Sequence, residues 1–96
     1  MNDGQAADIA KALSHPLRFE LLRELRQRKD LSPVQYARES DEPLGNVSYH
    51  FGVLARAGVI AQTGAVARRG AMEHLYSLSG RKAKVTLAVL DLLGEA

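Results

Sequence analysis

The sequence predicts a mainly α-helical fold with one small β-hairpin. Apolar residues recur at helical spacing in five segments, which lie at residues 5–13, 16–28, 33–39, 44–57 and 81–93. Between the last two segments, two short runs of strand character flank a glycine-bounded loop, as in a hairpin. The chain has 96 residues, of which 46% are apolar, so residues 1–96 are expected to form a single domain with a modest core.

The composition excludes several kinds of site and location. The sequence contains no cysteine, which removes disulfides, thiolate metal sites and cysteine nucleophiles. It has no apolar run of about eighteen residues, as a membrane helix requires, and its first residues lack the basic and apolar regions of a signal peptide. We therefore expect a cytoplasmic protein that does not contact a membrane.

The first two helices are expected to meet at the break Ser14-His15-Pro16, because proline suits the first turn of a helix. The first helix, 5–13, carries Ile9 and Leu13 on one apolar stripe. In the second helix the leucines form the inner face, whereas Arg18 is expected to face water.

Residues 32–57 have the pattern of a helix-turn-helix. Ser32 and Pro33 are typical of an N-cap and first helical position, and the short third helix ends near Glu39. A turn at residues 40–43 leads into the longer fourth helix. In this motif the longer helix enters the major groove of DNA.

The fourth helix has an unusual outer face. Helical spacing gathers Val47, Phe51 and Leu54 on the inner side, with His50 expected as a histidine at the edge of the core. The outer side carries Gly45, Tyr49, Gly52 and Arg56, with Ser48 beside them. Glycine costs roughly 1 kcal/mol in a helix interior, so an outer face with two glycines favours close approach of another backbone, such as that of DNA. A poorly optimised surface helix is the alternative.

The hairpin is expected to comprise a strand at 59–63, a loop at 64–71 and a second strand at 72–78, with Gly58 ending the preceding helix. The tip carries Arg68 and Arg69 beside a glycine. Adjacent arginines at an exposed tip are typical of a wing that contacts phosphates or a minor groove, although incidental charge on a solvated turn would look the same. The predicted fold is therefore a winged helix-turn-helix.

The last helix, 81–93, is apolar on all sides after a basic start, so it must be buried on more than one side. One side can pack on the core of the domain, and the other requires a partner. The apolar stripe of helix 5–13 offers a similar surface. We predict that the two terminal helices form a homodimer interface, with the contact residues Ile9, Leu13, Val85, Val89, Leu90 and Leu93.

The charges of the chain are unevenly distributed. Residues 30–42 hold four acidic residues and one arginine, whereas residues 43–84 hold six basic residues and one acidic residue. A basic second half indicates an anionic partner that this half contacts, and chance clustering in a mildly basic protein is the alternative.

Two segments resemble a known family. The segment from Ala12 to Leu22, ALSHPLRFELL, and the run VSYHF at 47–51, followed by Leu54 and the AGVI of residues 57–60, are similar to winged helix-turn-helix regulators of the ArsR type. The resemblance implies a dimeric, sequence-specific DNA-binding regulator, usually a repressor. It also implies that Asn46, Ser48 and Tyr49 lie near bases.

The predicted partner is double-stranded DNA with a pseudo-palindromic operator, because the two recognition helices of a dimer enter successive major grooves. Ser48 and Tyr49 are expected at base edges or nearby phosphates, and Arg56 at a backbone phosphate. Together with the wing and the resemblance, the predicted DNA-binding residues are Gly45, Asn46, Ser48, Tyr49, Arg56, Arg68 and Arg69.

The chain departs from the metal-sensing members of that family, since it has no cysteine and its last helix has no histidine. We therefore expect no metal and no cofactor. The sequence also offers no Ser/His/acid set and no phosphate-binding glycine loop, so an enzyme is not expected. The alternative from another class is a winged-helix interaction module that docks a protein partner through the apolar last helix.

Overall fold

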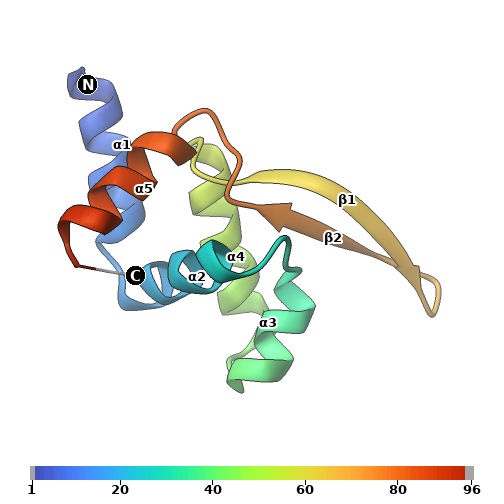
Figure 1. The fold of residues 1–96 in the computed structure, drawn as a ribbon. Coiled ribbons are helices and arrows are strands. Elements are labelled where there is room, and N and C mark those ends of the chain that lie inside the picture. The colour runs from blue at the N-terminus through green and yellow to red at the C-terminus, as the bar shows by residue number, and fades with distance from the viewer. Residues whose placement is uncertain (1, 95–96) are drawn as a thin grey trace.

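The computed structural model describes residues 2–94, in which five helices and a two-stranded antiparallel sheet follow the predicted order (Figure 1). The helices are α1 (Asp3–Leu13), α2 (Pro16–Gln27), α3 (Pro33–Ser40), α4 (Leu44–Arg56) and α5 (Ala83–Leu92). The strands are β1 (Ala61–Arg68) and β2 (Ala71–Ser77). The predicted fold class, mainly α with one β-hairpin, is confirmed. None of the described helices is both long and apolar enough to cross a membrane.

The helices begin where the sequence supplies caps. The Ser32 hydroxyl accepts a hydrogen bond from the Gln35 N–H at 3.0 Å, and Pro33 opens α3. His15 acts in the same way for α2, because its Nδ1 accepts from the Leu17 N–H at 3.1 Å. These side chains replace the intrahelical partners that the first N–H groups of a helix lack.

The core lies where α2, α4 and the base of the hairpin meet. Its fully buried members include Leu21, Leu22, Leu31, Val47, Phe51, Leu54, Val59, Ile60 and Leu90. Leu31 and Tyr76 exchange two backbone hydrogen bonds of 2.9 Å, which tie the segment before α3 to β2. The Tyr76 ring also packs against Phe51 of α4, with the centroids 5.4 Å apart. This contact joins α4 to the root of the hairpin.

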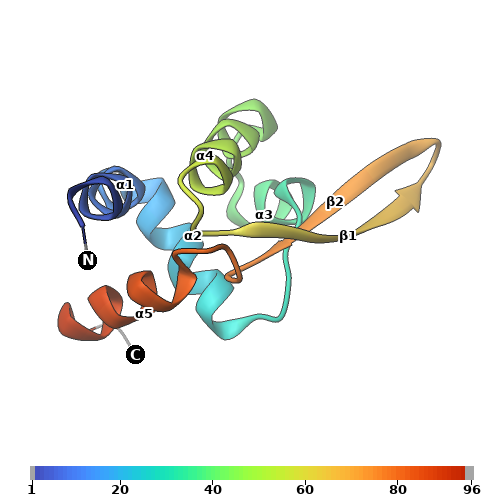
Figure 2. The same cartoon turned by 90° about the horizontal axis from the view of Figure 1, so that it is seen from above.

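The hairpin is longer than predicted, and the expected loop at 64–71 is wrong. β1 continues to Arg68, and only Arg69 and Gly70 form the turn, with φ angles of 50° and 82°. Positive φ at both central residues is the two-residue turn that fits the twist of an antiparallel pair. The expected start at Val59 is also wrong, because Val59 is buried in the core before β1 begins. Figure 2 shows the hairpin projecting away from α1 and α5.

The expectation for Arg18 is wrong as well. Its side chain is only 8% exposed, and its guanidinium donates to the Lys11 carbonyl and the Ser14 hydroxyl at 2.8 and 3.0 Å. A buried guanidinium is tolerated because these acceptors satisfy it. Arg18 thereby connects the end of α1 to α2.

The junction after the hairpin is built on two glycines. Gly58 ends α4 with a φ of 79°, as predicted, and its carbonyl accepts the Lys82 N–H at 2.7 Å. Gly80 crosses so close that a Cβ there would lie 2.3 Å from the Gly58 oxygen. The Gly80 N–H donates to the Val59 carbonyl at 3.2 Å. The chain leaving the wing is therefore bound to the end of α4.

Replacing Gly80 with alanine should lower the free energy of unfolding by about 2 kcal/mol or more, because the added methyl overlaps rigid backbone. Gly45→Ala is the matched control, since nothing lies within 4 Å of a Cβ at that helical position, and it should raise stability by up to about 1 kcal/mol. Urea denaturation of both variants measures these changes. Equal stability of the two variants would contradict the close approach at Gly80.

Candidate nucleic-acid interface

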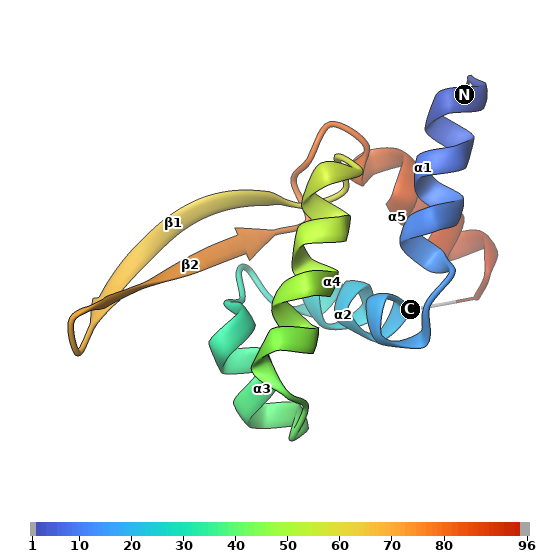
Figure 3. The same cartoon turned by 180° about the vertical axis from the view of Figure 1, so that it is seen from behind.

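The helix α4 turns its apolar side inward as its spacing predicts. Val47, Phe51 and Leu54 are buried, and so is His50, which confirms it as a histidine at the edge of the core. Gly45, Asn46, Ser48 and Tyr49 all lie exposed on the first two turns, and Tyr49 is 60% exposed. Figure 3 shows α4 beside α3, with the hairpin reaching out on the same side as α3. The helix therefore presents a polar surface that a DNA groove can reach.

The exposed residues of α4 border different hollows. Ser48 lines a groove of about 270 Å³ between α4 and the wing, together with Leu44, Met72 and His74. Asn46 lies on the other flank, in a hollow beside α2. Asn46 and Ser48 thus flank Tyr49 from two sides. Their contact with bases stays a prediction.

The outer glycines have two different surroundings. No atom lies within 4 Å of a Cβ built at Gly45, so this position is open to a second molecule. A Cβ built at Gly52 would lie 3.0 Å from the Arg56 guanidinium. Gly52 therefore makes room for an arginine of its own helix, which sequence reasoning did not foresee. Arg56 itself is exposed on the last turn.

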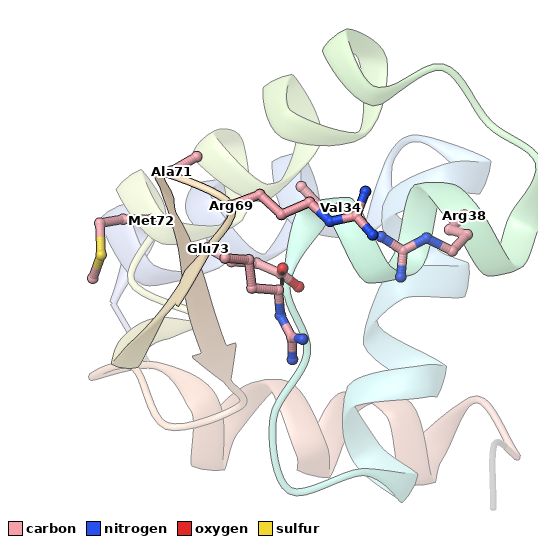
Figure 4. A pocket seen from close by; sticks show the side chains of 7 residues that line it. Val34, Arg38, Arg69, Ala71, Met72 and Glu73 are labelled. Carbon is pink, nitrogen blue, oxygen red and sulfur yellow. Dashed lines mark ion pairs between the residues drawn. The ribbon is translucent and has the colours of Figure 1, made fainter.

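The two arginines at the wing tip have different surroundings. The Arg68 Nε lies 3.0 Å from a carboxylate oxygen of Glu73 on the opposite strand. Glu73 also accepts a hydrogen bond from the Ser32 hydroxyl at 2.5 Å, which anchors the wing to the start of α3. Arg69 lies in the turn, where both it and Arg68 line a cavity of about 560 Å³ facing α3 (Figure 4). Sequence reasoning missed Glu73 because Ser32 comes from a distant segment and Arg68 meets it only through the register of the extended hairpin.

A polar cluster lies beneath the N-terminal half of α4. The Arg18 Nη1 donates to the His50 Nδ1 at 2.9 Å, and the His15 and His50 rings have centroids 4.3 Å apart. An arginine can only donate, so Nδ1 of His50 carries no proton. Burial foremost, and then the electrostatic effects of the neighbouring His15 and Arg18, lower the pKa of His50 below its usual 6.5, against a weaker opposite effect of Glu42.

The terminal helices only partly match the predicted dimer interface. Leu90 is 0% exposed and Ile9 4%, so both pack inside the protomer and cannot supply contact area to a partner. Leu13, Val85 and Val89 are half-buried, and Leu93 is 58% exposed. The neighbouring Leu92, which the prediction omitted, is 86% exposed. An apolar surface is therefore present, but it lies further along α5.

The helix α5 is fixed to the body at both ends. Lys82 pairs with Asp8 of α1, and Asp91 pairs with Arg26 of α2. These ion pairs are partly exposed, so each contributes little to stability, and the buried side chains of Ala83, Thr86 and Leu90 hold the helix against the body. In the described part of the chain, no three His, Asp or Glu side chains gather closely enough to hold a metal ion.

Comparison with known proteins identifies the motif. A family model described as a helix-turn-helix domain matches residues 13–63, which is more than half of the chain. No curated protein sequence matches the chain significantly.

Solved structures share the fold over nearly the whole chain. Reduced HlyU from Vibrio cholerae is 23% identical, with a TM-score of 0.74 over 96% of this chain and 90% of that one. The transcriptional repressor BigR from Xylella fastidiosa is 22% identical, with a TM-score of 0.64 and coverages of 92% and 85%. An ArsR family transcriptional regulator designated RHA00566 is 19% identical, with a TM-score of 0.67 and coverages of 100% and 96%. The expected resemblance and the winged helix-turn-helix fold are confirmed.

The lowered pKa of His50 predicts a pH-dependent stability. The unfolded chain binds a proton at His50 more readily than the folded chain does, so the free energy of unfolding should fall as the pH drops below about 6.5. Urea denaturation at pH 7.5 and 5.5 measures the fall, and His50→Gln should reduce it. His74→Gln, on the exposed wing, should leave it unchanged. An equal fall in wild type and His50→Gln would assign it to other groups.

Proposed function

The chain belongs to the helix-turn-helix domain family, and we propose that it is a sequence-specific, homodimeric repressor of transcription. Family membership and fold support the coarser statement, a DNA-binding transcriptional regulator. The observation that carries the finer proposal is the exposed polar face of α4, which borders the same groove as the wing. A helix and a hairpin that flank one groove can contact a duplex together.

In this proposal α4 enters the major groove. Ser48 and Tyr49 contact base edges, and the Tyr49 ring packs against a thymine methyl group. Arg56 contacts a backbone phosphate beyond the last turn, and the wing contacts the flanking backbone or minor groove. Few side chains can read bases, so phosphate contacts supply much of the affinity.

The dimer is proposed from the surface of α5. Leu92 and Leu93 are exposed apolar side chains at the end of the helix, and Val85 and Val89 retain part of their surface. Their removal from water by a second copy is favourable at about 25 cal/mol per Å². For the two α4 helices to enter successive major grooves, the two-fold axis of the dimer must hold them about 34–36 Å apart, one helical turn of DNA. Repression then follows from occupation of a promoter.

We propose that no metal ion regulates this binding. The absence of cysteine supports this, since thiolates are the strongest ligands for soft metal ions. Addition of Zn²⁺ or chelator is accordingly expected to leave the affinity for DNA unchanged.

A fluorescence-anisotropy titration with the DNA upstream of the protein's own gene tests the proposal. Wild type should bind this DNA tightly, and the complex should persist in excess unrelated DNA. Its affinity should fall as the salt concentration rises. Tyr49→Ala should lose about 1–3 kcal/mol of preference for this DNA over unrelated DNA, whereas Arg56→Ala should weaken both alike. Binding that competitor abolishes would contradict specific recognition at this site. Absence of binding at low salt would favour the alternative function, a winged-helix module that docks a protein partner.

The dimer has its own test. Leu93→Glu places a charge on the proposed apolar interface and should convert a dimer to a monomer in sedimentation velocity, with an unchanged circular dichroism spectrum. Leu44→Glu is the control, because Leu44 is a similarly exposed leucine that begins α4 and is not part of the proposed interface. A dimer that persists in Leu93→Glu would move the interface elsewhere.

A further inference from the structure

The cavity between the wing and α3 collects more positive than negative charge. Arg38 of α3 and Arg69 of the wing turn both line it, and their guanidinium groups point toward one another (Figure 4). Arg68 lies at the same cavity but is paired with Glu73. In the described residues, no carboxylate lies within 4.0 Å of a side-chain nitrogen of Arg38 or Arg69. The cavity therefore has a net positive wall.

This arrangement favours an anion between the two arginines. Like charges that converge across a water-filled space repel each other, and an anion placed between them reverses the sign of both interactions. Guanidinium groups offer several N–H donors in a fixed plane, which suit the oxygens of a phosphate group. The volume of about 560 Å³ leaves ample room for one phosphate and its neighbouring sugar.

The position of the cavity indicates which phosphate would enter it. The cavity shares Val34, Met72 and Glu73 with the groove that Ser48 of α4 borders, so the two hollows adjoin each other. A duplex held by α4 would therefore pass its backbone along the same surface. We propose that Arg38 and Arg69 bind one backbone phosphate of the DNA that α4 reads. This rests on the proposed function and adds to it a residue of α3, Arg38.

Glu73 gives the two wing arginines different roles. Its carboxylate neutralises Arg68, and its hydrogen bond from Ser32 holds that pair against α3. Arg68 is thus a positioning residue that shapes the wing, and Arg69 is left to bind the phosphate. Glu73 also places a negative charge on the wall of an anion site, which lowers the affinity of that site for DNA.

The test is the slope of log K against log salt concentration, measured by anisotropy on one duplex. One phosphate contact contributes about 0.9 to this slope, or roughly eightfold in affinity at 0.1 M salt. Because the two arginines share one phosphate, Arg38→Gln with Arg69→Gln should lose about 0.9 in slope, not twice that. Lys84→Gln, which removes an exposed charge on α5, is the control and should leave the slope nearly unchanged.

The outcomes distinguish a failure of the proposed phosphate site from a failure of the proposed DNA binding. If wild type binds DNA and Arg38→Gln with Arg69→Gln has the same affinity and slope as Lys84→Gln, the shared phosphate site is overturned and the regulator stands. A loss of about 1.8 in the double variant would mean two independent phosphates and would overturn the shared site. Saturable binding of inorganic phosphate that needs Arg38, with an unchanged slope on DNA, would assign the cavity to a free anion. If wild type binds no duplex, both proposals fail.

Glu73→Gln gives a change of the opposite sign. Glutamine keeps an oxygen that can accept the Ser32 hydroxyl, but it removes the negative charge and releases Arg68. DNA binding should become tighter, by up to about eightfold at 0.1 M salt if Arg68 gains one phosphate. Weaker binding at unchanged thermal stability would show that the carboxylate is required and would overturn the assigned role of Glu73.

Discussion

The burial of one face of α4 is the constraint on which the rest of the structure depends. Val47, Phe51 and Leu54 each remove an apolar side chain from water, which is worth about 1.5–3 kcal/mol per residue. This fixes the rotation of the helix about its axis and thereby decides which residues face outward. Phe51 also contacts Tyr76, whose backbone is bonded to Leu31. The same face therefore orients α4, the wing root and the segment that leads into α3.

The elements with a clear period could be predicted from the sequence, and those without one could not. In α4 the apolar residues recur at helical spacing, and the structure buries the predicted group. Residues 64–67 offer only glycine, alanine and valine, which give no alternation of polar and apolar side chains, so the extended β1 was missed. In α5 apolar residues lie all round, so the sequence could not show that Leu90, not Leu92, faces the core.

Charged residues were the hardest to place, because their surroundings come from distant parts of the chain. Arg18 looks like a surface residue in its helix, yet the carbonyl of Lys11, the Ser14 hydroxyl and His50 together satisfy its buried guanidinium. The sequence identified both arginines at the wing tip, but not that only one of them is paired with a carboxylate. That difference arises from Glu73, which only the register of the hairpin brings to Arg68.

The junction of Gly58 and Gly80 has a consequence for the DNA. Backbone hydrogen bonds join the end of α4 to the segment that leaves the wing, and they restrict the separation of α4 and the wing root. In the proposed complex the duplex would therefore supply part of the adjustment. Base steps that bend or twist at low cost would fit this restricted separation better than stiff ones. The operator would then be selected partly at base pairs that no side chain touches.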